Sequence, residues 1–237
     1  MILSERHKFI YFCNSKTGTT SVEKALRHLD DGDRYRFGAP GLFGARHIPP
    51  VMVRALMPGE LWRSCFKFTF VRNPYDWVVS QWFHNFTGAK RPNWLRHPIG
   101  RLRHHAGGFR RILGRTRRDL DAMRDKVFTP ADVRFLHEFL QDYRVLPAQP
   151  AKLQAHFLLD PDGKELVDFV GRFERLDQDF THAMEKIGQK GIELPHERRT
   201  LHRDYRAYFT TESAAEVARI WARDFEVLGY STDLHAP

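Results

Sequence analysis

A length of 237 residues suits one α/β domain, and the composition, 42% hydrophobic and 28% charged, is that of a globular protein with an apolar core. No apolar stretch is long enough to span a bilayer, and the first apolar run is too short for a signal peptide. The formal net charge is +9, and twelve Lys or Arg residues against three Asp concentrate it between 84 and 126. We therefore expect a cytoplasmic protein in which Cys13 and Cys65 are inert buried thiols.

The first part of the chain is predicted to open with a buried strand at 8–13, followed by a turn of small residues. That turn leads into a helix whose apolar residues, from Val22 onward, recur at helical spacing. The elements expected next are short helices at 50–56 and 59–64, a strand at 66–71 and a helix at 75–83.

The second part is predicted to be mostly helical. We expect an amphipathic helix within the basic segment 84–126, a helix after 129, a turn at 160–163 between apolar runs at 156–159 and 166–170, and helices at 177–187 and 212–228. Strands alternating with helices indicate the α/β class, with a mostly parallel sheet flanked by helices. We expect a single domain over 1–237, with 84–126 as a basic helical insertion.

The segment 14–21 has the features of an anion-binding loop, because it lies between a buried strand and the start of a helix. Free backbone N–H groups point outward there, and a glycine lets the backbone approach a ligand. The candidate ligand-binding residues are Lys16, Thr17, Gly18, Thr19, Thr20 and Ser21. The lysine precedes the glycine, so the segment is not a Walker A loop, and a standard ATPase or GTPase is disfavoured. The alternative is that the segment binds no ligand and only caps the helix, with its threonine hydroxyls paired to the N–H groups of that helix.

A second anion site is predicted where the strand at 66–71 ends. Arg72 follows that strand, and Ser80 lies about two turns into the next helix, so a guanidinium and a hydroxyl can converge on one phosphate. Two such sites at the ends of neighbouring parallel strands suggest a nucleotide with phosphates at two positions.

Together these segments resemble the sulfotransferases that use 3′-phosphoadenosine 5′-phosphosulfate (PAPS). The run from Ser15 to Ser21 resembles their 5′-phosphosulfate loop, and the run from Phe70 to Ser80 resembles their 3′-phosphate motif. Downstream resemblance is to the carbohydrate sulfotransferase branch, in the runs 167–176, 179–180, 194–196 and 224–230 and at Tyr205. The likeness spans about 8–231, and it identifies the chain as a soluble bacterial member with a P-loop-like sulfotransferase fold.

The resemblance implies transfer of a sulfuryl group from PAPS to a hydroxyl of a carbohydrate, with release of adenosine 3′,5′-bisphosphate. Lys16 would stabilise the bridging oxygen of the leaving phosphate. A sulfuryl group carries less charge than a phosphoryl group, so no metal is expected. His47 is the candidate general base, since histidine titrates near neutral pH and this one lies on the loop before the second strand. His202 and Glu174 are the competing candidates.

The resemblance also implies contacts from the last part of the chain. In related enzymes a late basic and hydroxyl cluster folds over the nucleotide, which makes Arg198 and Thr200 candidate contacts, although Arg198 also fits a solvated loop. Arg172 and Glu174 are expected to form a structural ion pair. The basic segment 84–126 fits either a solvated helical face or a surface that attracts an acidic acceptor.

Two other functions compete with sulfuryl transfer. The first is a protein that binds nucleotides or nucleic acid without chemistry, but the sequence lacks the motifs of nucleic-acid recognition. The second is a kinase-type phosphotransferase, which the position of Lys16 and the absence of a carboxylate cluster oppose. The partners we expect are therefore PAPS and a hydroxyl acceptor, and no nucleic acid.

Overall fold

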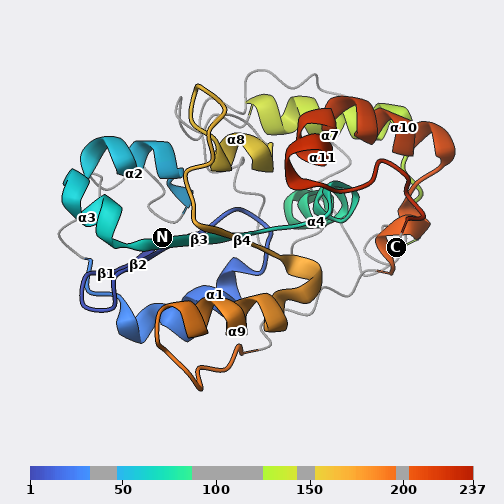
Figure 1. The fold of residues 1–237 in the computed structure, drawn as a ribbon. Coiled ribbons are helices and arrows are strands. Elements are labelled where there is room, and N and C mark those ends of the chain that lie inside the picture. The colour runs from blue at the N-terminus through green and yellow to red at the C-terminus, as the bar shows by residue number, and fades with distance from the viewer. Residues whose placement is uncertain (33–46, 87–124, 143–152, 196–202, 237) are drawn as a thin grey trace. The chain divides into compact units, whose positions relative to one another are not determined.

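The structural framework is one sheet of four strands in the order β1-β2-β3-β4 (Figure 1). It is seen in a computed structural model that describes residues 1–32, 47–86, 125–142, 153–195 and 203–236. The strands are β1 (Ile2–Ser4), β2 (Phe9–Phe12), β3 (Phe66–Val71) and β4 (Phe169–Arg172). β1 pairs antiparallel with β2, whereas β2, β3 and β4 run parallel. The carboxyl ends of the three parallel strands therefore share one edge.

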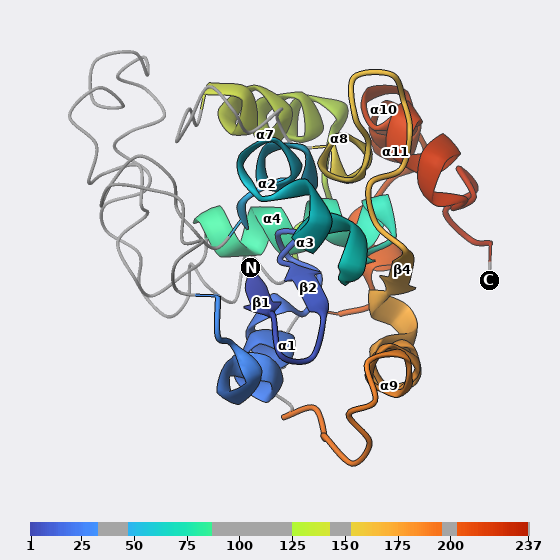
Figure 2. The same ribbon diagram turned by 60° about the vertical axis from the view of Figure 1, so that its left-hand side comes forward.

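Each face of the sheet is covered by helices, because alternate residues of a strand point to opposite sides. Phe9 and Tyr11 belong to the apolar cluster on one face, where the helices are α1 (Thr19–Leu26) and α9 (Leu176–Lys186). Ile10 and Phe12 belong to the cluster on the other face, with residues of α2 (Pro50–Leu56), α3 (Gly59–Ser64) and α8 (Gln154–Leu158). Figure 2 shows the same three layers from a second direction.

The described chain divides into two compact units. The sheet unit comprises the described residues within 1–73, 144–199 and 223–230, and it contains the whole sheet. The helical unit comprises the described residues within 74–143, 200–222 and 231–237.

The helical unit is built around aromatic side chains. Its helices are α4 (Pro74–Phe86), α7 (Pro130–Asp142), α10 (Thr211–Ile220) and the short 3₁₀ helix η6 (Tyr205–Tyr208). The rings of Trp77 and Trp221 meet edge to face at 6.3 Å, and those of Trp82 and Phe128 lie 5.1 Å apart. Such pairs stabilise a core beyond the area that they bury.

Most of the elements expected from sequence are confirmed, and two differences stand out. The helix expected at 212–228 is wrong as a single element, because Trp221 leaves helical geometry at ψ 24° and α11 (Ala222–Leu228) begins after it. β1 was not expected, since three residues carry no periodic signal. The amphipathic helix predicted in the basic segment falls on 87–124, outside the described residues.

Cys13 and Cys65 are both free and buried, as expected. Burial raises the pKa of the Cys13 thiol to about 12, so it stays protonated and unreactive beside the loop that follows it. None of the described helices is long and apolar enough to cross a membrane.

Candidate functional site

The loop between β2 and α1 has a strained backbone. Lys16 adopts a left-handed conformation with φ 66°, and Gly18 does so with φ 79° at the N-cap of α1. A left-handed non-glycine residue costs about 1–3 kcal/mol and tends to occur where function requires it. Alternation of left-handed residues of this kind turns backbone N–H groups toward one side, which is how concave anion sites are built.

Packing of the loop against the start of α9 explains the glycine. A Cβ at Gly18 would lie 2.6 Å from Cδ2 of Leu176, in addition to being strained at that φ. The hydroxyl of Thr17 is fully buried and donates to the carbonyl of Asn14 at 2.8 Å. The Thr17 side chain is therefore turned toward the loop itself, where it stabilises the turn.

Arg72 lies beside this loop because β2 and β3 are parallel neighbours and both end at the same edge. Its Nη1 donates to the carbonyl of Lys16 at 3.3 Å, and its guanidinium lies over the ring of Phe173 at 4.2 Å. Only 4% of Arg72 is exposed. Stacking and burial hold the planar cation in one orientation, as recognition of a phosphate requires.

The backbone of Arg72 is also held from the other side. Gln154 accepts from the Arg72 N–H at 2.8 Å and donates to the Arg72 carbonyl at 2.7 Å. The carboxylate of Asp224 in turn accepts from the backbone N–H groups of Gln154 and Ala155 at 3.0 and 2.8 Å. These contacts all lie within the sheet unit.

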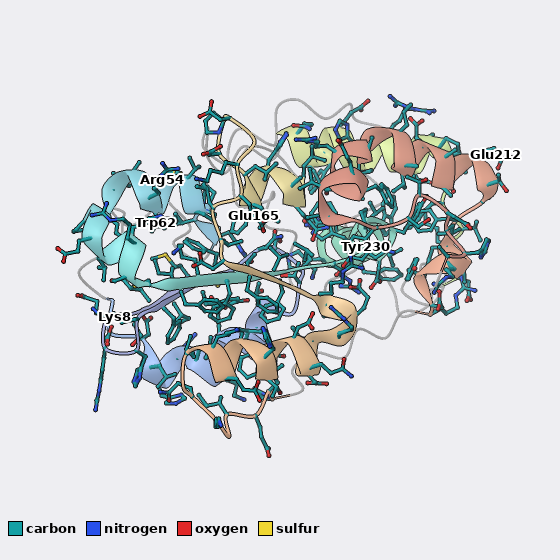
Figure 3. All side chains as sticks on the ribbon, in the orientation of Figure 1. Lys8, Arg54, Trp62, Glu165, Glu212 and Tyr230 are labelled. Carbon is teal, nitrogen blue, oxygen red and sulfur yellow. The ribbon has the colours of Figure 1, made fainter. Side chains whose placement is uncertain are left out.

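Glu174 follows β4 at the same edge, and both of its carboxylate oxygens accept hydrogen bonds. The Asn73 N–H donates to it at 2.7 Å, and the Tyr230 hydroxyl donates at 2.8 Å. Burial, and then the charge of Glu174, raises the pKa of Tyr230 above its ordinary value, so the hydroxyl stays a donor. Figure 3 shows Tyr230 beyond the carboxyl end of β4, with Lys8 and Trp62 at the opposite edge.

The direct ion pair expected between Arg172 and Glu174 is wrong. The Arg172 guanidinium instead lies over the ring of Tyr230 at 4.4 Å and donates to the carbonyls of Leu228 and Gly229 at 3.2 Å. Tyr230 thus connects the two side chains, which fixes the carboxyl end of α11 against β4. Each carboxylate oxygen of Glu174 accepts one hydrogen bond, and its candidacy as a base stays a prediction.

His47 reaches the carboxyl end of β2, as its position in the sequence suggested. Its Nδ1 lies 2.7 Å from the carbonyl oxygen of Cys13. Because a carbonyl oxygen only accepts, Nδ1 carries the proton and Nε2 carries the lone pair of the neutral ring. The tether therefore selects the tautomer that a general base needs.

The remaining predicted residues belong to the helical unit or lie outside the described residues. Ser80 is a buried residue of α4 in the helical unit, so its shared contact with Arg72 remains a prediction. Arg198, Thr200 and His202 lie outside the described residues, whereas Tyr205 opens η6. Among the described residues, no group of three or more His, Cys, Asp or Glu side chains could hold a metal ion.

Three contributors were missed as site residues by sequence reasoning. Phe173 and Asp224 fall inside runs that carried the family resemblance, but nothing in those runs indicated contact with Arg72 or with α8. Gln154 carries no motif at all, and only the folded chain brings it to the end of β3.

Comparison with known proteins identifies the family. A family model described as the sulfotransferase family matches residues 1–231. The chain belongs to the sulfotransferase family. No curated protein and no solved structure gave a match. A sulfotransferase moves a sulfuryl group to a hydroxyl acceptor, and the mixed α/β architecture with its helix-flanked sheet is consistent with that family.

Proposed function

We propose that this sulfotransferase takes its sulfuryl group from PAPS, with the loop 14–21 and Arg72 as the core of the donor site. The observation that carries the proposal is the meeting of the loop and Arg72 at one edge of the parallel strands, joined by the contact from Arg72 Nη1 to the Lys16 carbonyl. A helix start preceded by two left-handed residues, with an arginine beside it, favours a negatively charged ligand. Lys16, Thr17, Gly18, Thr19, Thr20 and Ser21 would hold the 5′-phosphosulfate, and Arg72 the 3′-phosphate.

His47 is the proposed general base. Its Nε2 would take the proton of the acceptor hydroxyl as that oxygen forms its bond to sulfur. The bond between sulfur and the bridging oxygen breaks, and its electron pair leaves with adenosine 3′,5′-bisphosphate. Lys16 would neutralise the charge that develops on this oxygen, which is the electrostatic role typical of group transfer from a phosphate.

The acceptor we propose is a carbohydrate hydroxyl. The support is the resemblance of the runs 167–176 and 224–230 to the carbohydrate branch, whose residues form the β4 edge and α11 here. The basic segment 84–126 favours an acidic carbohydrate, one that carries uronate or sulfate groups.

The experiment that tests this function is transfer of labelled sulfur from PAPS to a panel of acidic and neutral glycans. We expect labelled glycan and adenosine 3′,5′-bisphosphate in equal amounts, with acidic glycans preferred. His182→Ala is a matched control for His47→Ala, because His182 is an exposed residue of α9 that stacks on Phe169. Donor binding without transfer to any acceptor would favour a non-catalytic nucleotide-binding protein instead.

A further inference from the structure

Arg72 follows the end of β3, and the hydrogen bonds that hold its backbone do not come from a neighbouring strand. β3 ends at Val71, so the backbone of Arg72 lies beyond the last ladder pairing, which joins Val71 to Arg172. An unpaired strand end of this kind is free to shift unless its N–H and carbonyl find other partners. Here both partners come from one side chain, that of Gln154.

The two hydrogen bonds of Gln154 act as a clamp. Its amide is oriented so that Oε1 accepts from the Arg72 N–H and Nε2 donates to the Arg72 carbonyl, at 2.8 and 2.7 Å. This is the pattern by which a neighbouring strand would pair with one residue. Gln154 is 1% exposed, so water does not replace these bonds if they are broken.

Gln154 is itself fixed by Asp224. It is the first residue of α8, and its N–H donates to Asp224 Oδ2 while the Ala155 N–H donates to Oδ1. Asp224 is 0% exposed and thus caps the start of α8 from within the core. The position of the Gln154 side chain therefore depends on Asp224, 70 residues further along the chain.

The clamp on the backbone of Arg72 also affects the position of its guanidinium. The same residue contacts the Lys16 carbonyl and the Phe173 ring with its guanidinium, so a shift of its backbone would move that group. A displacement of about 1 Å in a group that positions a substrate can reduce a rate a hundredfold. We propose that Gln154 and Asp224 are positioning residues that set Arg72 for the 3′-phosphate of the donor. This proposal rests on the donor site described above.

The test is a double-mutant cycle with two ligands. Adenosine 3′,5′-bisphosphate and adenosine 5′-monophosphate, which lacks the 3′-phosphate, are titrated calorimetrically into wild type, Gln154→Ala, Arg72→Ala and the double variant. We expect Gln154→Ala to weaken the bisphosphate at least about tenfold, and less than about twofold when Arg72 is already alanine. Binding of the monophosphate should change less than about twofold in each case.

Two further variants separate positioning from stability. Leu158→Ala removes a buried side chain of the same helix without touching Arg72, and it should lower the melting temperature while leaving bisphosphate affinity within about twofold. Gln154→Met keeps the buried volume and removes both clamp bonds, so it should reproduce the loss seen with alanine if the latter folds poorly.

The outcomes distinguish the positioning role of Gln154 and Asp224 from the proposed donor site. Equal losses for both ligands, equal losses with and without Arg72, or the same loss from Leu158→Ala would each overturn the positioning role and leave the donor site standing. Failure of the wild type to bind adenosine 3′,5′-bisphosphate would overturn the proposed donor, and the positioning role with it.

Discussion

Arg72 carries a permanent charge and is only 4% exposed, and a buried charge is costly unless it is paired and hydrogen-bonded. Its stacking on Phe173 and its bond to the Lys16 carbonyl orient the guanidinium. Lysine at this position would keep the charge but lose the planar fork and the stacking. The contact with a phosphate that we propose for Arg72 depends on this planar fork.

Replacement of Arg72 by alanine should weaken adenosine 3′,5′-bisphosphate by about 1.5–3 kcal/mol, the range of hydrogen bonds to charged groups. Calorimetric titration measures this directly, and circular dichroism checks that the variant is folded. Arg175→Ala is a suitable control, since Arg175 is an exposed arginine that pairs with Asp179 in α9. An Arg72 variant with wild-type affinity would remove this residue from the site.

The His47 ring is oriented by the contact of its Nδ1 with the Cys13 carbonyl. The variant His47→Ala should lose about 10²–10⁴-fold in kcat, the usual contribution of a general base, while the affinity for the donor product stays unchanged. Steady-state kinetics and calorimetry measure the two quantities separately. Turnover close to that of the wild type would exclude His47, and His202 would be examined next.

At the scale of elements, α8 shows how a helix of five residues is held in place. Isolated helices of this length are unstable in water, so its stability comes from packing and from the Asp224 cap. Burial raises the pKa of Asp224 to about 7, against the lowering effect of the Ala155 and Gln154 N–H donors. The capping group therefore titrates within the range of ordinary assays.

This shift gives a dependence of stability on pH. From about pH 4 to pH 7 the folded chain holds a proton on Asp224 that the unfolded chain has released, so the free energy of unfolding falls as pH rises, by roughly 4 kcal/mol from this group. Asp224→Asn cannot titrate, and its stability relative to wild type should improve over that window. Urea denaturation at several pH values measures it, and parallel curves for the two proteins would contradict the prediction.

Elements that follow from local rules were predictable from the sequence. The bounds expected for α2, α3 and β3 agree with the structure, because Pro50 suits a first helical turn and the strand residues form one buried apolar run. The break at Trp221 was not predictable, since the apolar period continues through it. β1 was too short to leave a pattern.

The candidate site was predictable only in part, for a similar reason. Lys16 to Ser21 and Arg72 lie next to strand ends, so their meeting follows once the strands are known to be parallel neighbours. The contact between His47 and Cys13 joins residues that are 34 positions apart in the chain. The clamp between Gln154 and Arg72 joins residues that are 82 positions apart. No local pattern encodes contacts of that kind.

At the scale of the whole molecule, the charge is unevenly spread along the sequence. The net charge of +9 arises between 84 and 126, and the donor contacts we propose lie elsewhere. We therefore consider a variant in which glutamine replaces Arg110, Arg111, Arg117 and Arg118. The KM for an acidic glycan should rise and depend less on salt, because less electrostatic attraction between the segment and the glycan remains for salt to screen. The KM for PAPS should stay nearly constant. Unchanged acceptor kinetics would indicate a solvated segment and move neutral acceptors ahead of acidic ones.

The identity of the sulfuryl donor can be tested by a calorimetric comparison of nucleotides that bind to the wild-type protein. We predict that adenosine 3′,5′-bisphosphate binds in one-to-one stoichiometry and raises the melting temperature, since a ligand that binds only the folded state stabilises it. ATP with Mg²⁺ should bind far more weakly, because the loop 14–21 lacks the Walker A arrangement. Tight binding of ATP with Mg²⁺, and none of the bisphosphate, would contradict the account.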